Sequence, residues 1–222
     1  MDPIPSGWPP RSEGTSPPVV PLFPLPQIWL VPRVFLPLRI FERRYRQMIE
    51  DCLDGPGRIV LGTVVHGYED EILGSPPIYP IAGLGEIGRH DRKADGQFEI
   101  LLYGIERVSV REVQSDRLYR KVEFESAIEK PVPLEQHEEL HIELEEAIRA
   151  RNERGFSREA PISMLIDYLI LTIPLPAEMM QQCYMEMDLE RRARRVLSEH
   201  AIRPVLKEMR GGERDMGFPG FE

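Results

Sequence analysis

The chain has 222 residues, of which 41% are hydrophobic and 29% are charged, a composition typical of soluble globular proteins. Its formal net charge is −9, and neither residues 1–130 nor residues 131–222 are basic. Because neutralisation of phosphates supplies most of the affinity of nucleic-acid-binding proteins, nucleic acid is not the expected partner.

Membrane and export segments are not expected either. Residues 162–175 come closest to a membrane span, but they are shorter than the roughly 18–20 residues needed, and Asp167 interrupts them. Residues 1–18 are rich in Pro, Ser and Gly and lack the apolar region of a signal peptide, which predicts a disordered tail. Cys52 and Cys183 are too few for a zinc cluster or a disulfide framework, so we expect buried small side chains in a cytoplasmic protein.

Residues 19–130 are expected to be rich in strands. PLFPLP at 21–26 and VFLPLRI at 34–40 are short apolar segments with proline, which predicts strands at sheet edges because proline cannot donate to a ladder. From Arg58 onward apolar residues alternate in several short segments, and Asp95-Gly96 predicts a hairpin turn. Closely spaced strands of this kind predict a small barrel or a folded sheet.

One helix is predicted early in this region, over residues 41–53. Its buried face is indicated by apolar side chains that recur at helical spacing, namely Phe41, Tyr45, Met48, Ile49 and Cys52. The sequence Gly55-Pro56-Gly57 then predicts the end of the helix.

After Pro131 the hydrophobic period becomes helical. Four helices are predicted: one through Leu140 to Arg151, one at 161–173, one after Pro174-Leu175-Pro176 and one capped by Asp188. We therefore expect a tail at 1–18, a β domain at 19–130, a helical subdomain at 131–205 and a flexible tail at 206–222.

His137-Glu138-Glu139-Leu140-His141 fits the H-E-x-x-H pattern of zinc peptidases. On a helix the two histidines lie one turn apart and can bind one zinc ion, while the glutamate acts as general base on the bound water. However, Glu139 is charged, the segment resembles a solvated acidic helix, and Glu159 and Glu178 are no more than candidate third ligands. We favour an exposed helix with two surface histidines, and a zinc metallopeptidase using His137, Glu138 and His141 is the enzyme alternative.

Two other patterns have a plainer structural explanation. Residues 83–88, GLGEIG, fit the G-x-G-x-x-G pattern, but no helix is predicted after Gly88, so we expect glycines in a strongly bent strand. The arginines of the last helix are flanked by acids, so we expect a solvated face for Arg191, Arg192, Arg194 and Arg195. The sequence contains neither a P-loop nor a G-x-S-x-G motif.

Two stretches of the sequence resemble the N-terminal domain family of Lon proteases. The first is PLFPLP at 21–26 with LPLRIFERRYRQM at 36–48, and the second spans 95–108 with Tyr119-Arg120 beyond it. The helical remainder is similar to the family more loosely. The resemblance implies an α+β fold, a PUA-like β pseudobarrel with one packed helix followed by a C-terminal helical bundle. Core positions would then include Phe41, Tyr45, Met48 and Ile49.

The resemblance also implies a function. In full-length Lon this region helps to select unfolded or tagged polypeptides, whereas later domains hydrolyse ATP and cut peptides. We therefore expect a non-enzymatic substrate-recognition module, an adaptor in protein quality control whose partners are unfolded or tagged polypeptides and a protease. Binding is expected through exposed apolar surface rimmed by charge, in a groove between the β domain and the helices.

No catalytic, cofactor-binding or metal-binding residue is assigned, no cofactor is expected, and the substrate-binding residues and the oligomeric state stay open. RNA binding is a further alternative, since PUA-like folds can bind RNA, but the acidic balance opposes it.

Overall fold

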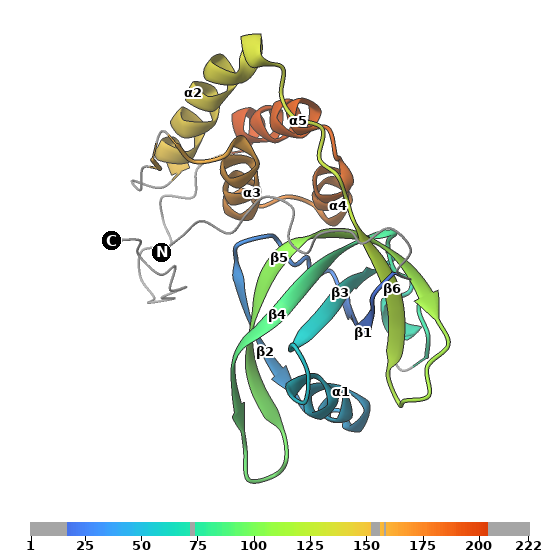
Figure 1. Ribbon diagram of the computed structural model, residues 1–222. Coiled ribbons are helices and arrows are strands. Elements are labelled where there is room, and N and C mark those ends of the chain that lie inside the picture. The colour runs from blue at the N-terminus through green and yellow to red at the C-terminus, as the bar shows by residue number, and fades with distance from the viewer. Residues whose placement is uncertain (1–16, 72–73, 152–155, 158, 204–222) are drawn as a thin grey trace.

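The computed structural model describes residues 17–71, 74–151, 156–157 and 159–203. The predicted tails lie outside these residues, except for Pro17 and Pro18. Among the described residues, strands and one helix come first along the chain, and a group of helices follows them (Figure 1). Within the described ranges, no helix is both long enough and apolar enough to cross a membrane.

In the part of the chain that the structure describes, six strands form a single sheet. They are β1 (Val19–Pro26), β2 (Phe35–Ile40), β3 (Arg58–Val64), β4 (Ile81–Arg92), β5 (Phe98–Val113) and β6 (Arg120–Ser126). The strand order is β2-β5-β4-β3-β1-β6, and β5 also pairs with β6. The sheet therefore closes into a barrel, with β2 attached to the first half of β5, and the predicted pseudobarrel is confirmed. Several segments predicted as separate strands are continuous in β4 and β5.

The proline-containing strands differ in their position. β2, which carries Pro37, lies at the end of the sheet order as predicted. The same prediction is wrong for β1, which pairs with β6 through Val19–Leu22 and in parallel with β3 through Leu22–Pro26. The first half of β1 pairs with β6 and the second half pairs with β3. Pro24 and Pro26 lie in the second half, where β1 has a neighbouring strand on one side only, so their missing N–H groups break no second ladder.

Helix α1 (Arg43–Leu53) packs on the barrel through one apolar face. The buried residues of this face are Tyr45, Met48, Ile49 and Cys52. The prediction that Phe41 belongs to this core is wrong, because its side chain is 62% exposed. Phe41 precedes the N-cap residue Glu42, whose backbone is extended with φ −67° and ψ 138°, so helical spacing does not apply to it.

Glycines of β4 and β5 let the segment between β1 and β2 pass close to the sheet. A Cβ on Gly83 would lie 2.6 Å from the Cβ of Leu30, and one on Gly104 would overlap the carbonyl oxygen of Val31. The N–H of Arg33 donates to the carbonyl of Gly104 at 2.7 Å. The G-x-G-x-x-G pattern is thus part of a strand, and two register shifts in β4 fit the predicted bending.

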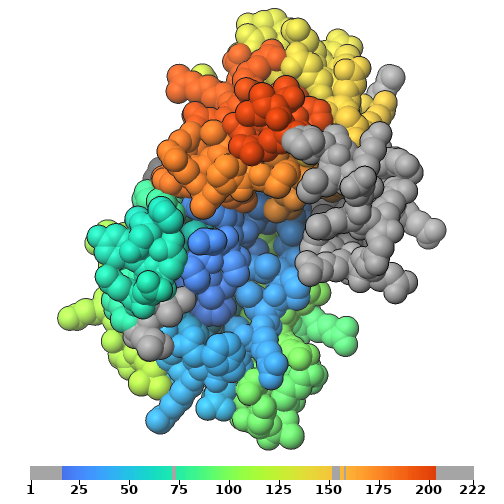
Figure 2. Space-filling model, turned by 180° about the vertical axis from the view of Figure 1, so that it is seen from behind, coloured from blue at the N-terminus to red at the C-terminus, as the bar shows by residue number. Residues whose placement is uncertain are grey.

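Four helices of the described ranges cover one end of the barrel. They are α2 (Leu134–Arg151), α3 (Ile162–Thr172), α4 (Ala177–Met185) and α5 (Leu189–Ile202), in addition to a short 3-10 turn, η1 (Glu69–Glu71). Figure 1 places them at the end opposite to α1, and Figure 2 shows the same stacking from behind, with the helices in yellow to red. The predicted cap is confirmed, since Oδ1 of Asp188 accepts the N–H of Arg191 at 3.2 Å.

A buried ionic cluster joins the strands to the helices. Arg107 of β5 donates from both terminal nitrogens to the Asp167 carboxylate of α3, at 2.7 and 3.0 Å. Burial opposes the charge of Arg107, but the charge and hydrogen bonds of Asp167 outweigh it, so the pKa of Arg107 lies above its ordinary value. The prediction of a solvated face fails for Arg192, which is fully buried and donates to Glu129 at 2.6 Å.

Candidate functional site

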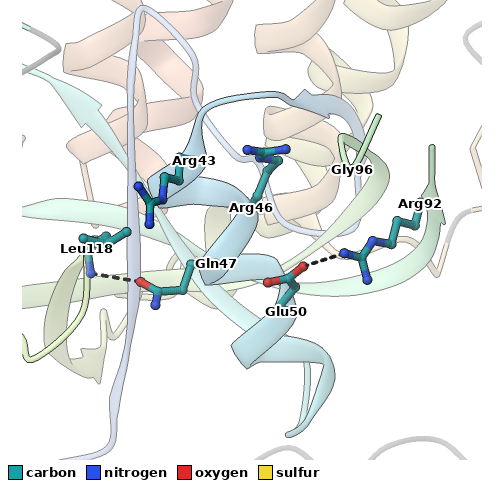
Figure 3. A pocket seen from close by; sticks show the side chains of 7 residues that line it. All are labelled: Arg43, Arg46, Gln47, Glu50, Arg92, Gly96 and Leu118. Atoms are coloured by element: carbon teal, nitrogen blue, oxygen red, sulfur yellow. Dashed lines mark hydrogen bonds and ion pairs between the residues drawn. The ribbon is translucent and has the colours of Figure 1, made fainter. Parts of the chain in front are cut away.

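A groove runs across the exposed face of α1. Seven residues line it: Arg43, Arg46, Gln47, Glu50, Arg92, Gly96 and Leu118. Its volume is about 330 Å³. Figure 3 shows the side chains of Arg43, Arg46, Gln47 and Glu50 projecting from α1, with the β4–β5 hairpin on one side and the β5–β6 loop on the other. We call this surface the α1 groove.

The floor of the α1 groove follows from helix geometry. Arg43, Arg46, Gln47 and Glu50 are spaced at i, i+3, i+4 and i+7, which brings their side chains onto one face of the helix. The apolar residues between them face the barrel. Burial of the apolar face therefore fixes the polar face outward.

Hydrogen bonds hold both walls of the groove against this floor. On one side the backbone N–H of Leu118 donates to Oε1 of Gln47 at 3.0 Å. On the other side Nη2 of Arg92 donates to Oε1 of Glu50 at 3.0 Å. The groove is therefore shaped before any ligand arrives, which reduces the entropy lost on binding.

The charges in the groove are not balanced. Arg43 forms no hydrogen bond or ion pair with any residue that the structure describes. Arg46 donates one long bond to the Asp95 carbonyl at 3.4 Å, and its buried Nε has no partner among the described residues. Glu50 is the one acid in the lining and already pairs with Arg92. Three arginines and one glutamate give the groove a net charge of +2 in a chain of net charge −9.

The H-E-x-x-H segment lines a second hollow, of about 470 Å³, along α2. His137 is exposed, but the prediction of two surface histidines is wrong for His141, which is 8% exposed. Nε2 of His141 donates to the carbonyl of Ala160 at 3.1 Å, which leaves Nδ1 as its free nitrogen. Nδ1 lies 3.8 Å from Glu145.

A third zinc ligand is not found in the described part of the chain. No group of three or more His, Cys, Asp or Glu side chains lies there in a position to hold a metal ion. Of the two candidate third ligands, Glu159 is exposed beside Ala160, and Glu178 on α4 accepts from Gln182 at 3.4 Å. The zinc alternative therefore gains no support from this geometry.

The two cysteines are free thiols in the interior. Cys52 is 6% exposed and Cys183 is fully buried. Burial raises the pKa of Cys52 to about 12 and that of Cys183 to about 11. Since the thiolate is the nucleophile, neither cysteine is suited to covalent catalysis at neutral pH.

A binding groove was expected between the strands and the helices, but buried side chains fill the middle of this interface. Nε of Arg107 donates to the backbone carbonyl of Tyr184 at 3.1 Å, and the Tyr184 hydroxyl donates to the Leu30 carbonyl at 2.6 Å. These groups and Asp167 are buried against one another. The ionic cluster thus connects the two parts, whereas open donors lie at the other end, in the α1 groove.

A closed barrel with one packed helix, followed by a helical bundle, is the PUA-like α+β fold that the sequence predicted. The family model described as the ATP-dependent protease La (LON) substrate-binding domain matches residues 19–199. The chain therefore belongs to the Lon substrate-binding domain family. No curated protein matches the sequence.

Solved structures agree in fold. The N-terminal domain of Mycobacterium avium complex Lon protease is 16% identical with a TM-score of 0.65, and the match covers 83% of this chain and 99% of that one. A Lon N-terminal domain protein from Xanthomonas campestris is 22% identical with a TM-score of 0.60, covering 82% and 98%. At these identities the similarity establishes the fold alone.

No residue of the α1 groove was predicted from the sequence to bind a ligand. One signal was present, the polar stripe of Arg43, Arg46, Gln47 and Glu50 opposite the apolar face. The sequence around Arg92 and Leu118, which line the walls of the groove, does not indicate this position, because only the tertiary fold brings them next to α1.

Proposed function

We propose that this protein is a non-catalytic recognition module that binds unfolded or tagged polypeptides and presents them to a protease, and that the α1 groove is its binding surface. The observation that carries the proposal is the set of open donors beside exposed apolar side chains. Leu118 on the groove wall is 56% exposed, and Phe41, two residues before Arg43, is 62% exposed. Family membership supports polypeptide as the ligand class.

An adaptor role fits the position of this surface. The α1 groove and the helices lie at opposite ends of the barrel, so a client segment in the groove leaves the helices open to a second protein (Figure 1). We assign the protein to the cytoplasm, because free buried thiols such as Cys52 and Cys183 suit a reducing compartment.

Binding to a permanently unfolded protein tests this function. We expect a reduced and carbamidomethylated protein to bind in fluorescence anisotropy, and its native form not to bind. Leu118→Ser should weaken binding by about fivefold, as expected for loss of about 1 kcal/mol of apolar contact. The matched control is Leu134→Ser, because Leu134 is 91% exposed on α2, away from the groove.

Either of two results would contradict the proposal. One is the absence of binding to the unfolded protein. The other is equal weakening by Leu118→Ser and Leu134→Ser, which would show that the groove contributes nothing of its own. Peptide hydrolysis that requires added zinc and is abolished by His141→Ala would instead support the enzyme alternative.

A further inference from the structure

We propose that the α1 groove selects polypeptide segments in which an Asp or Glu side chain lies beside an apolar residue. This inference rests on the proposed function and names the substrate class of the same groove. Arg43 and Arg46 receive the carboxylate, and Leu118 contacts the apolar neighbour. Polypeptide binding itself does not require this selectivity.

The two arginines form a suitable receptor for a carboxylate. They are three residues apart on α1 and both line the groove, Arg43 on the side of Leu118 and Arg46 on the side of Gly96 (Figure 3). A guanidinium presents its donors as a planar fork that matches the two oxygens of a carboxylate. Nε of Arg46 lies buried without a partner among the described residues, a state that costs free energy until an acceptor arrives.

Arg43 and Arg46 line the same groove, and neither has a carboxylate partner among the described residues. The chain has 37 acidic and 28 basic residues, so carboxylate side chains outnumber cationic side chains. Exposed arginines outside the groove are of both kinds: Arg111 pairs with Glu123, whereas Arg89 has no carboxylate partner among the described residues. The described residues around Arg43 supply no such partner. The groove differs from an isolated position such as that of Arg89 because two arginines line it together, and this geometry fits a carboxylate brought by the ligand.

The wall opposite the hairpin supplies the apolar contact. Leu118 is held beside Gln47 by its backbone N–H, so its position does not depend on the ligand. Its side chain is more than half exposed and borders the same groove as the two arginines. Neighbouring side chains of an extended segment point to opposite sides, which lets a carboxylate and an apolar group reach different walls.

A pair of labelled disordered peptides tests the selectivity. The first carries Glu beside Leu, and the second has Gln in place of each Glu. At low ionic strength we expect the acidic peptide to bind the full chain about tenfold more tightly, and high salt should remove most of this difference. Arg43→Gln with Arg46→Gln should lower acidic-peptide affinity to that of the Gln peptide and leave the Gln peptide unaffected.

The matched control is Arg111→Gln with Arg191→Gln. It changes the net charge equally, and both side chains are exposed outside the groove, at 76% and 74%. We expect it to keep the tenfold preference. A single Arg43→Glu variant gives a second readout, because Arg43 is exposed and pairs with no residue in the described ranges, so its replacement should fold. This variant should favour a peptide with Lys in place of Glu.

Three results would overturn the inference. They are equal binding of the acidic and Gln peptides by the unaltered protein, equal losses in the groove and control double variants, and displacement of the acidic peptide by a lower concentration of single-stranded RNA. If unfolded protein still binds without charge preference, the inference fails and the proposed function stands. If neither unfolded protein nor any peptide binds, both fail.

Discussion

Arginine has opposite environments at the two ends of the barrel. At the helical end Arg107 and Arg192 are almost fully buried, and each donates to a carboxylate. At the α1 end Arg43 is exposed without a partner among the described residues, and Arg46 keeps a donor that none of these residues accepts. The same side chain therefore connects two parts of the protein at one end and stays open to a ligand at the other.

The difference follows from the energy of burial. A buried charge without a partner loses several kcal/mol of hydration, so the charges at the helical end must be satisfied within the fold. At the surface water supplies hydration, and an arginine can stay unpaired at little cost. Residues of the helical end should therefore control stability, and residues of the α1 end should control binding.

The largest expected effect is that of Asp167→Ala at the helical end. The substitution leaves Arg107 buried without its bidentate partner, and Arg192 lies 3.9 Å from the same carboxylate. We expect the free energy of unfolding to fall by about 3–5 kcal/mol in urea denaturation. Arg43→Ala at the α1 end should change it by less than about 0.5 kcal/mol. If the two substitutions lowered the free energy of unfolding equally, the proposed difference between the two ends of the barrel would be wrong.

Tyr184→Phe should have a smaller effect at the same end. It removes the hydroxyl that donates to the Leu30 carbonyl at 2.6 Å and leaves this buried acceptor unpaired. We expect a loss of about 1–2 kcal/mol in the free energy of unfolding, with peptide binding unchanged. A loss of peptide affinity in a folded Tyr184→Phe variant would show that the two ends are not independent.

The smallest effect is a pH dependence at the surface. Lys130 donates to the Asp188 carboxylate at 2.7 Å and, with the N–H of Arg191, holds the pKa of Asp188 below its ordinary value. The unfolded state is therefore protonated first on acidification. The stabilisation is complete above the ordinary Asp pKa of about 3.9 and is lost as the pH falls below it.

Asp188→Asn isolates this titration, because Asn can still cap α5 but does not ionise. Unaltered protein should be more stable than the variant at pH 6, and the difference should shrink at pH 3 in urea denaturation. A difference that is the same at both values would contradict the assignment of the shift to Asp188.

Local signals in the sequence were sufficient for much of the fold. The apolar spacing of Tyr45, Met48, Ile49 and Cys52 predicted α1, and Asp188 predicted the start of α5. Phe41 was misplaced because it shares the spacing of this face but precedes the helix. Periodicity cannot reveal where a helix begins when an apolar residue stands just before its cap.

Contacts between distant segments were not predictable in the same way. Gly83 and Gly104 lie where Leu30 and Val31 pass too close to the sheet for a side chain. Nothing near either glycine in the sequence indicates this close approach. Arg192 was expected at the surface because its neighbours are charged, yet its partner Glu129 lies far away in the sequence. The walls of the α1 groove depend on the same kind of contact.

Backbone amide shifts in NMR spectra of the full chain, recorded with and without the Glu-containing peptide, test most directly that the α1 groove binds polypeptide. We predict that the largest shift changes lie in three segments that meet there: α1, residues 93–97 and residues 114–119. They should be absent in the Arg43→Gln, Arg46→Gln variant. Changes concentrated on α2, or around Arg107 and Asp167, would contradict the account.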